Sequence, residues 1–187
     1  MASHKNACPL IRQALLGLLA HERLDKVTVS EIAAAAGVNR KTLYYYYDGK
    51  DDIVEDILRE AYRVVTGCSP DAELPVVTFD VIEVDAMTRR NLQRTIENVE
   101  LMQSLMTSEL ADAFSDFMWA RTSEHVRGLS RPLVSDERDL DLVARCKYLS
   151  FFDVFRNWAA SGCAIPIDEA LKQLWTVFDR SLEPARA

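Results

Sequence analysis

Apolar residues recur at every third or fourth position through most of the chain, which is the spacing of amphipathic α-helices. Six Gly and six Pro residues, spread along the 187 residues, interrupt this pattern at a few points. We expect helices at 9–22, between Thr28 and Gly37, and at 40–46, 50–66, 76–97, 99–106, 111–129, 137–160 and 167–182. The pattern therefore predicts an all-α protein.

The segment 28–50 has the densest set of helix-start and helix-stop signals. Thr28 and Glu31 form a T-x-x-E capping box, and Gly37 allows the sharp turn that ends a short helix. Asn39 is well suited to cap the helix that follows only one residue later. Two short helices joined by a tight glycine-containing turn constitute a helix-turn-helix unit.

Helix 40–46 is expected to present groups suited to DNA. Helical spacing places three apolar or aromatic residues on the inward side: Val38, Leu43 and Tyr47. The remaining side chains are expected outside: Arg40, Lys41, Thr42, Tyr44, Tyr45 and Tyr46. Arg can form two hydrogen bonds to guanine, Thr can contact a thymine methyl group, and Tyr hydroxyls can reach phosphates. Lys50 stands where a helix dipole disfavours a cation, so we expect it to bind a phosphate.

The charge is unevenly distributed along the chain. Residues 1–50 carry seven Lys and Arg against four Asp and Glu, a net charge of +3. Residues 51–187 carry 15 against 25, a net charge of −10, which gives −7 for the whole chain. A basic end on an acidic body can meet phosphates in one orientation only, so the acidic total does not argue against DNA.

The sequence contains few motifs typical of metal-binding proteins, enzymes or membrane proteins. Cys8, Cys68, Cys146 and Cys163 lie far apart without histidines at ligand spacing, so we expect free thiols and no metal site. His125 is the single histidine after residue 50, and no GxSxG, HExxH or glycine-rich loop occurs, so we expect neither an enzyme nor a cofactor. No apolar run reaches the ~18 residues of a membrane span, and we expect a cytoplasmic protein. A scaffold that binds a protein through its acidic body is the remaining alternative.

The two helices nearest the C-terminus have wide apolar faces rich in aromatic residues. Helix 137–160 ends at Ser161-Gly162, and helix 167–182 restarts after Pro166. Such helices can close a monomeric core, or they can pair with their copies in a four-helix bundle across a two-fold axis. The pattern leaves both arrangements open.

The stretch VTVSEIAAAAGVNRKTLYYYYDGKDDIVEDIL resembles the DNA-binding domain of the TetR family of bacterial transcriptional regulators, over roughly residues 8–65. The resemblance implies that Thr28, Asn39, Tyr44 and Lys50 contact phosphates, and that Arg40, Lys41, Thr42 and Tyr45 contact base edges or nearby backbone. At Tyr47 many members have Phe, so this hydroxyl needs a partner of its own.

The resemblance also implies a division of the chain. Residues 1–50 would bind double-stranded DNA, helix 50–66 would connect, and residues 67–187 would hold a small-molecule effector and form a homodimer. Family members dimerise through their last two helices, which favours these interface residues: Phe151, Phe155, Trp158, Leu171, Leu174, Trp175 and Phe178. The candidate effector pocket consists of Met102, Met106, Phe117, Trp119, Cys146, Tyr148 and Phe152. We therefore expect a repressor of a near-palindromic operator. The segment NWAASGCAIPIDEA also resembles the end of the bodies of dihydroxyacetone-kinase-regulator-like members.

Overall fold

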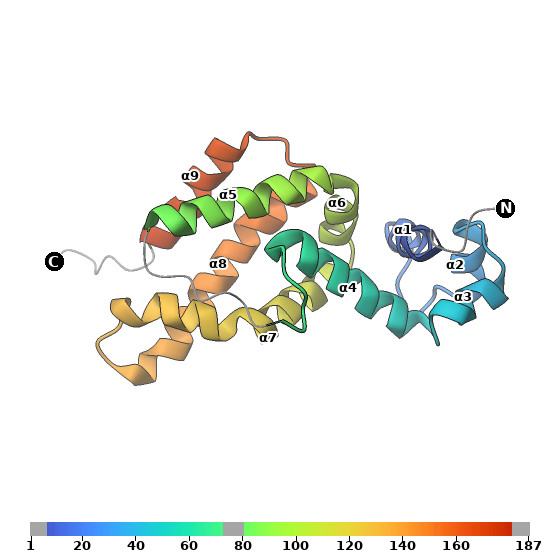
Figure 1. Ribbon diagram of the computed structural model, residues 1–187, viewed down its shortest axis with the longest axis horizontal. Coiled ribbons are helices and arrows are strands. Elements are labelled where there is room, and N and C mark those ends of the chain that lie inside the picture. Colours follow the sequence, from blue (N-terminus) through green and yellow to red (C-terminus); the bar gives the residue numbers. More distant parts are fainter. Residues whose placement is uncertain (1–6, 73–80, 181–187) are drawn as a thin grey trace.

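The structure, a computed structural model, describes residues 7–72 and 81–180, with the side chains of 81–85, 133, 175 and 177–180 left undescribed. Every regular element in these ranges is a helix (Figure 1). The order is α1 (Ala7–Leu19), α2 (Val29–Ala35), α3 (Arg40–Tyr46), α4 (Lys50–Thr66), α5 (Val81–Glu97), α6 (Val99–Thr107), α7 (Leu110–Ser130), α8 (Leu140–Ala160) and α9 (Ile167–Arg180). The expected all-α fold is confirmed.

Helices α1–α3, here called the head, lie at one end of the elongated molecule, and α5–α9, the body, lie at the other (Figure 1). Helix α4 extends from one to the other, and its buried face serves both. Ile53 and Ile57 belong to the buried core near the head, and Tyr62 faces Phe117 of the body. A rigid helix shared by two packed units can transmit a displacement of either one to the other.

Most helix boundaries follow the sequence pattern closely, and the differences have local causes. Helix α1 begins two residues before Pro9, which is tolerated in a first turn, and ends at Leu19. Helix α8 begins at Leu140, because the Asp136 side chain accepts a hydrogen bond from the Arg138 N–H and closes a separate 3₁₀ turn at Glu137–Asp139. Residues 76–80, the expected start of helix 76–97, and residues 181–182, the expected end of helix 167–182, lie outside the described residues.

The body is a bundle in which α8 is the central helix, packed against α6, α7 and α9. Its inward residues form a continuous aromatic row from Tyr148 through Phe152 and Phe155 to Trp158, with neighbouring ring centres 5.9–6.4 Å apart. Phe114 of α7 meets this row at Phe152. None of the helices in the part of the chain that the structure describes is long and apolar enough to cross a membrane.

The body end of α4 is closed by a glycine and an arginine. Gly67 has a left-handed backbone (φ 74°), and its N–H donates to the Arg63 carbonyl at 2.8 Å. The Arg94 guanidinium of α5 donates to the carbonyls of Val64 (3.0 Å) and Val65 (3.3 Å). Carbonyls that a helix end leaves unpaired are thereby satisfied from the body.

Replacing Gly67 with alanine is expected to destabilise the protein by about 1–2 kcal/mol, because an L-residue is strained at this φ. The added Cβ would also lie 2.9 Å from Cζ of Arg94 and push the guanidinium off the carbonyls. Thermal denaturation followed by circular dichroism measures the change. Gly17→Ala in α1 is the matched control, since its Cβ meets open space and helix propensity favours alanine by up to about 1 kcal/mol. Equal melting temperatures for the two variants would contradict this account of Gly67.

Candidate nucleic-acid interface

The turn between α2 and α3 holds α3 on the outer surface of the head. Gly37 adopts φ 67°, and the Val38 N–H donates to the Ala33 carbonyl at 3.0 Å. The Asn39 side chain then accepts the Thr42 N–H at 2.7 Å and caps α3. Both cap predictions are confirmed: the Asn39 cap here, and the Thr28–Glu31 capping box at the start of α2.

Four side chains of α3 are exposed, as predicted. Arg40 and Lys41 are exposed, and Tyr44 and Tyr45 keep 55% and 78% of their accessible surface. Leu43, on the opposite face, is fully buried in the core. An exposed face with two cations, two phenols and no carboxylate is suited to the phosphates and base edges of a groove.

Tyr46 and Thr42 are less accessible for contact with DNA than the sequence predicts. Tyr46 is half-buried, packs against the core, and stands edge-on to Tyr45 with ring centres 4.9 Å apart. Tyr46 is therefore only partly on the outside, and its contact with DNA stays a prediction. The Thr42 hydroxyl donates to the Asn39 side-chain oxygen at 3.0 Å. Its contact with DNA would therefore be made by the methyl group.

Thr28 is engaged within its capping box. Its hydroxyl donates to the Glu31 carboxylate at 2.7 Å and accepts the Glu31 N–H at 3.3 Å. The Thr28 N–H also donates to this carboxylate, at 2.7 Å. The two hydrogen bonds that the carboxylate accepts, first from the Thr28 side chain and then from its backbone, lower the pKa of Glu31. Donation from Thr28 to a phosphate would require the hydroxyl to leave Glu31, so this contact stays a prediction.

Lys50 has internal partners that its sequence position did not indicate. Its Nζ donates to the carbonyls of Leu24 at 2.6 Å and Val27 at 2.8 Å, in the turn between α1 and α2. The argument that a cation at this helix start must serve an outside ligand was wrong, because these carbonyls compensate the charge. An ammonium group has three donors, so one remains for the predicted phosphate.

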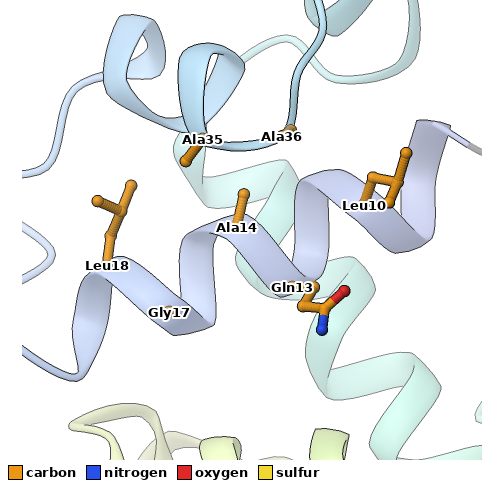
Figure 2. Close-up of a pocket in the computed structure, with 7 residues that line it drawn as sticks. All are labelled: Leu10, Gln13, Ala14, Gly17, Leu18, Ala35 and Ala36. Carbon is orange, nitrogen blue, oxygen red and sulfur yellow. The ribbon is translucent and has the colours of Figure 1, made fainter.

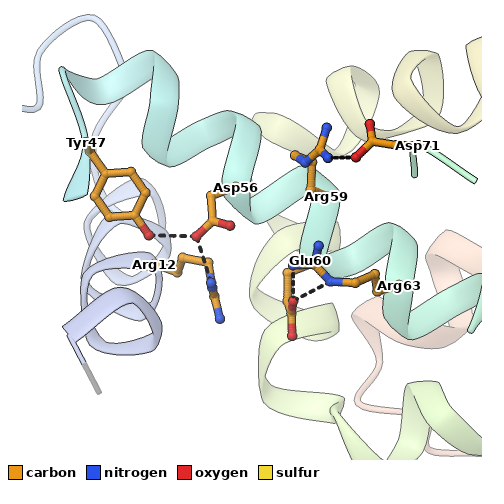
Figure 3. A network of polar contacts seen from close by, with 7 residues as sticks. All are labelled: Arg12, Tyr47, Asp56, Arg59, Glu60, Arg63 and Asp71. Atoms are coloured by element: carbon orange, nitrogen blue, oxygen red, sulfur yellow. Dashed lines mark hydrogen bonds and ion pairs between the residues drawn. The ribbon is translucent and has the colours of Figure 1, made fainter. Parts of the chain in front are cut away.

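A shared carboxylate fixes α3 and α1 to α4 (Figure 3). Asp56 Oδ2 accepts the Tyr47 hydroxyl at 2.6 Å and the Arg12 Nη1–H at 2.7 Å. Burial, together with the hydrogen bond to Asp56, raises the pKa of Tyr47, so the phenol remains a donor. This is the partner that the Tyr47 hydroxyl was expected to need. Sequence reasoning missed Arg12 and Asp56, which lie 44 residues apart on two amphipathic helices without a local signal.

A hollow of about 300 Å³ lies between α1 and α2 (Figure 2). Small side chains leave this space open, and the lining residues are Leu10, Gln13, Ala14, Gly17, Leu18, Ala35 and Ala36. None of them is charged, so the hollow offers a phosphate no cationic side chain.

The candidate effector residues do not form a single wall. Trp119 lies against Tyr148 (ring centres 5.1 Å), which stacks on Phe152, whereas Phe117 faces Tyr62 of α4. Burial raises the pKa of Tyr148 to about 12, and its hydroxyl donates to the Ser115 carbonyl at 2.6 Å. The α6 members, Met102 and Met106, are fully buried in the core.

Cys146 is exposed on α8, so its assignment to an interior pocket was wrong. The inward face of α8 contains Ala144 and Tyr148, and a residue midway between them points to the opposite side of the helix.

Several predicted dimer residues belong to the core of the single chain. Phe155, Trp158, Leu171 and Leu174 keep 3–5% of their accessible surface, and their assignment to an interface was wrong. Hydrophobic spacing identifies a buried face but does not tell which partner covers it. Phe151 is half-buried, and the side chains of Trp175 and Phe178 lie outside the described residues. Exposed leucines on α8 are instead Leu142 (66%) and Leu149 (44%).

Comparison with known proteins identifies the head. The sequence model "Bacterial regulatory proteins, tetR family" matches residues 11–57, which include α2, the turn and α3. The helix-turn-helix of the head is therefore that of a TetR-family DNA-binding domain. The chain is also 40% identical over 50 residues to "Uncharacterized HTH-type transcriptional regulator YxbF" of Bacillus subtilis (strain 168), a match that spans 27% of this chain and 13% of that relative's length.

The fold of the whole chain is similar to that of a solved structure. The solved structure "Dihydroxyacetone kinase operon activator DhaS" superposes with a TM-score of 0.54 at 12% identity, covering 95% of this chain and 97% of the other. A TetR-family transcriptional regulator from Streptomyces coelicolor gives a TM-score of 0.49 at 20% identity, covering 95% and 80%. The first of these likenesses shows that the two chains share a fold over both head and body.

Proposed function

We propose that the protein is a homodimeric transcriptional repressor that binds a near-palindromic DNA operator and is released from it by a small-molecule effector. The observation that carries the proposal is the exposed face of α3, where Arg40, Lys41, Tyr44 and Tyr45 project from a helix held by the Asn39 cap and a buried leucine. Side chains on a rigid helix can reach base edges in the major groove without a large loss of conformational entropy.

One seven-residue helix makes too few contacts to select a genomic site. Two copies related by a two-fold axis, with their α3 helices about 34–36 Å apart, would read two half-sites one helical turn apart. Residues 1–50 would then read DNA, α4 would connect, and residues 67–187 would set the distance between the heads. The basic head and acidic body would orient the approach to DNA.

The effector would act by binding one arrangement of the two heads more tightly than the other. We place its site among the aromatic and methionine side chains in the body interior: Met102, Met106, Phe117, Trp119, Tyr148 and Phe152. Their close packing implies that a ligand would displace side chains of α6 or α7 on entry. A displaced α6 or α7 would in turn move α4, which packs against α7.

For the dimer we propose the outer face of α8, where Leu142, Cys146 and Leu149 follow one another at helical spacing and are exposed. Leu149→Glu is expected to weaken dimerisation at least about tenfold, because burying one leucine contributes about 2 kcal/mol and the residue occurs twice in a two-fold interface. Analytical ultracentrifugation measures the dissociation constant. The matched control is Leu10→Glu, on an exposed leucine of α1. Equal dissociation constants for the two variants would place the interface elsewhere.

The proposed function is tested by selecting duplexes from a random-sequence pool with the wild-type protein and comparing them with the DNA upstream of its gene. We expect an inverted repeat in both, and we expect transcription from that promoter to rise when the gene is deleted. Since the solved structure that shares this fold is named an operon activator, a fall in transcription is the contrary outcome and would replace repression by activation. A pool that remains unenriched would overturn operator binding itself.

A further inference from the structure

In the turn between α1 and α2, both backbone groups of Leu24 form hydrogen bonds to side chains from other parts of the chain. Leu24 accepts the Lys50 ammonium at its carbonyl (2.6 Å) and donates its N–H to the Glu109 carboxylate. The Val27 carbonyl, three residues on, accepts the same ammonium at 2.8 Å. Lys50 belongs to α4, whereas Glu109 belongs to the corner between α6 and α7. The body therefore reaches the turn that ends at the Thr28 cap.

Glu109 occupies a position from which it would ordinarily serve its own helix. It is the N-cap residue of α7, yet its side chain makes no capping hydrogen bond there. The Ser108 hydroxyl accepts the Leu110 N–H at 3.2 Å in its place. The carboxylate is thus free to reach 85 residues back along the chain, where it makes a charge-assisted hydrogen bond.

We propose that Glu109 is a positioning residue for DNA binding, which holds the α1–α2 turn so that Lys50 and the start of α2 keep the geometry of the DNA-bound head. The proposal rests on the proposed function of the head as a DNA reader. It adds a direct connection from the body to the predicted phosphate contacts, beside the connection through α4. Leu24 is the link, because its two backbone groups receive one partner from each side.

This connection would respond to changes in the body. Met102 and Met106, on the helix that leads into the Glu109 corner, are buried, so a shift of α6 moves the carboxylate with it. A hydrogen bond weakens steeply when its donor and acceptor move out of line. Displacement of α6 would release the Leu24 N–H, loosen the turn and lower the affinity for DNA.

A purely electrostatic role for Glu109 makes the opposite prediction. If the carboxylate only repelled phosphates, Glu109→Gln and Glu109→Ala would both bind DNA more tightly than the wild type. In the positioning role, the amide oxygen of Glu109→Gln still accepts the Leu24 N–H and preserves affinity, whereas Glu109→Ala weakens binding. The glutamine variant therefore separates the two roles.

The experiment uses full-length protein and a duplex selected from a random-sequence pool by the wild type. For Glu109→Ala we expect Leu24 amide exchange to accelerate and DNA affinity to fall about tenfold, the effect of a hydrogen bond to a charged group at its lower end. The slope of affinity against salt should stay unchanged, because no phosphate contact is lost. Glu109→Gln, and the control Glu100→Ala on the exposed side of α6, should stay within twofold of the wild type.

Wild-type affinity for Glu109→Ala, alongside a loss of affinity for Arg40→Ala, would overturn this inference and leave the proposed function intact. Tighter binding by both Glu109 variants would overturn it in favour of simple repulsion. A wild-type protein that selects no DNA would overturn the proposed function, and this inference with it.

Discussion

Asp56→Ala is expected to lower the free energy of unfolding by about 2–3 kcal/mol, near the lower end of the cost of breaking a buried ion pair by removing one partner. The reason is the double use of one carboxylate oxygen, which accepts both the Arg12 guanidinium and the Tyr47 hydroxyl. The Arg12 and Asp56 side chains keep 15% and 28% of their accessible surface, so water screens the pair only in part. Without Asp56, a half-buried cation and a buried hydroxyl lose their partner together.

Chemical denaturation at pH 7 measures this effect, and Tyr47→Phe is the matched control. Phe keeps the ring in the core and removes only the hydroxyl, so we expect a loss of about 1 kcal/mol. Because Asp56 joins α4 to the middle of α1 and to the end of α3, Asp56→Ala should also weaken DNA binding more than Tyr47→Phe does. An Asp56→Ala variant no less stable than Tyr47→Phe would show that the Arg12 contact adds nothing.

Arg40→Ala is expected to weaken binding to the selected operator by about 1–3 kcal/mol, the contribution of a side chain that reads a base. In the free protein the guanidinium rests on the Ser30 hydroxyl of α2, an exposed contact that uses only one of its five donors. The remaining donors can meet guanine without disturbing the fold. Preference at one operator position should relax, and stability should change little.

Two variants separate base reading from general charge. Lys50→Ala should weaken binding to all sequences similarly and flatten the salt dependence by about one counterion, as expected for a phosphate contact. Arg131→Ala removes the same charge from an exposed position of the body, where Arg131 pairs with Glu137 at 2.9 Å, and should leave affinity nearly unchanged. Fluorescence anisotropy over a range of salt concentrations measures all three. Identical effects of Arg40→Ala and Arg131→Ala would remove α3 from the DNA contact.

The elements of the head were predictable because their signals are local. The Thr28–Glu31 capping box, Gly37 and the Asn39 cap each act within four residues, so the sequence determines α2, the turn and α3 almost residue by residue. Long-range polar contacts have no such signature. Three hydrogen bonds could be found only in the folded chain: Lys50 to the Leu24 carbonyl, Arg12 to the Asp56 carboxylate, and the Leu24 N–H to the Glu109 carboxylate.

In the body, helical spacing predicted which residues are buried but not against what. Phe155 and Trp158 were expected at a dimer interface and instead pack within the single chain. A second, weaker apolar stripe containing Leu142 and Leu149 lies on the other side of the same helix. From the sequence alone, either the wide aromatic face or the narrow leucine-containing face of this helix could form an interface. Only the packing of α8 against α6, α7 and α9 distinguishes them.

The central claim is that two copies of α3 together read a DNA sequence. The most direct test measures the affinity of the wild-type protein, at physiological salt, for the selected inverted-repeat duplex and for a shuffled duplex of the same length and composition. The account predicts that the inverted repeat binds at least about 1,000-fold more tightly, as specific DNA-binding proteins do. Equal affinity for the two duplexes would contradict it.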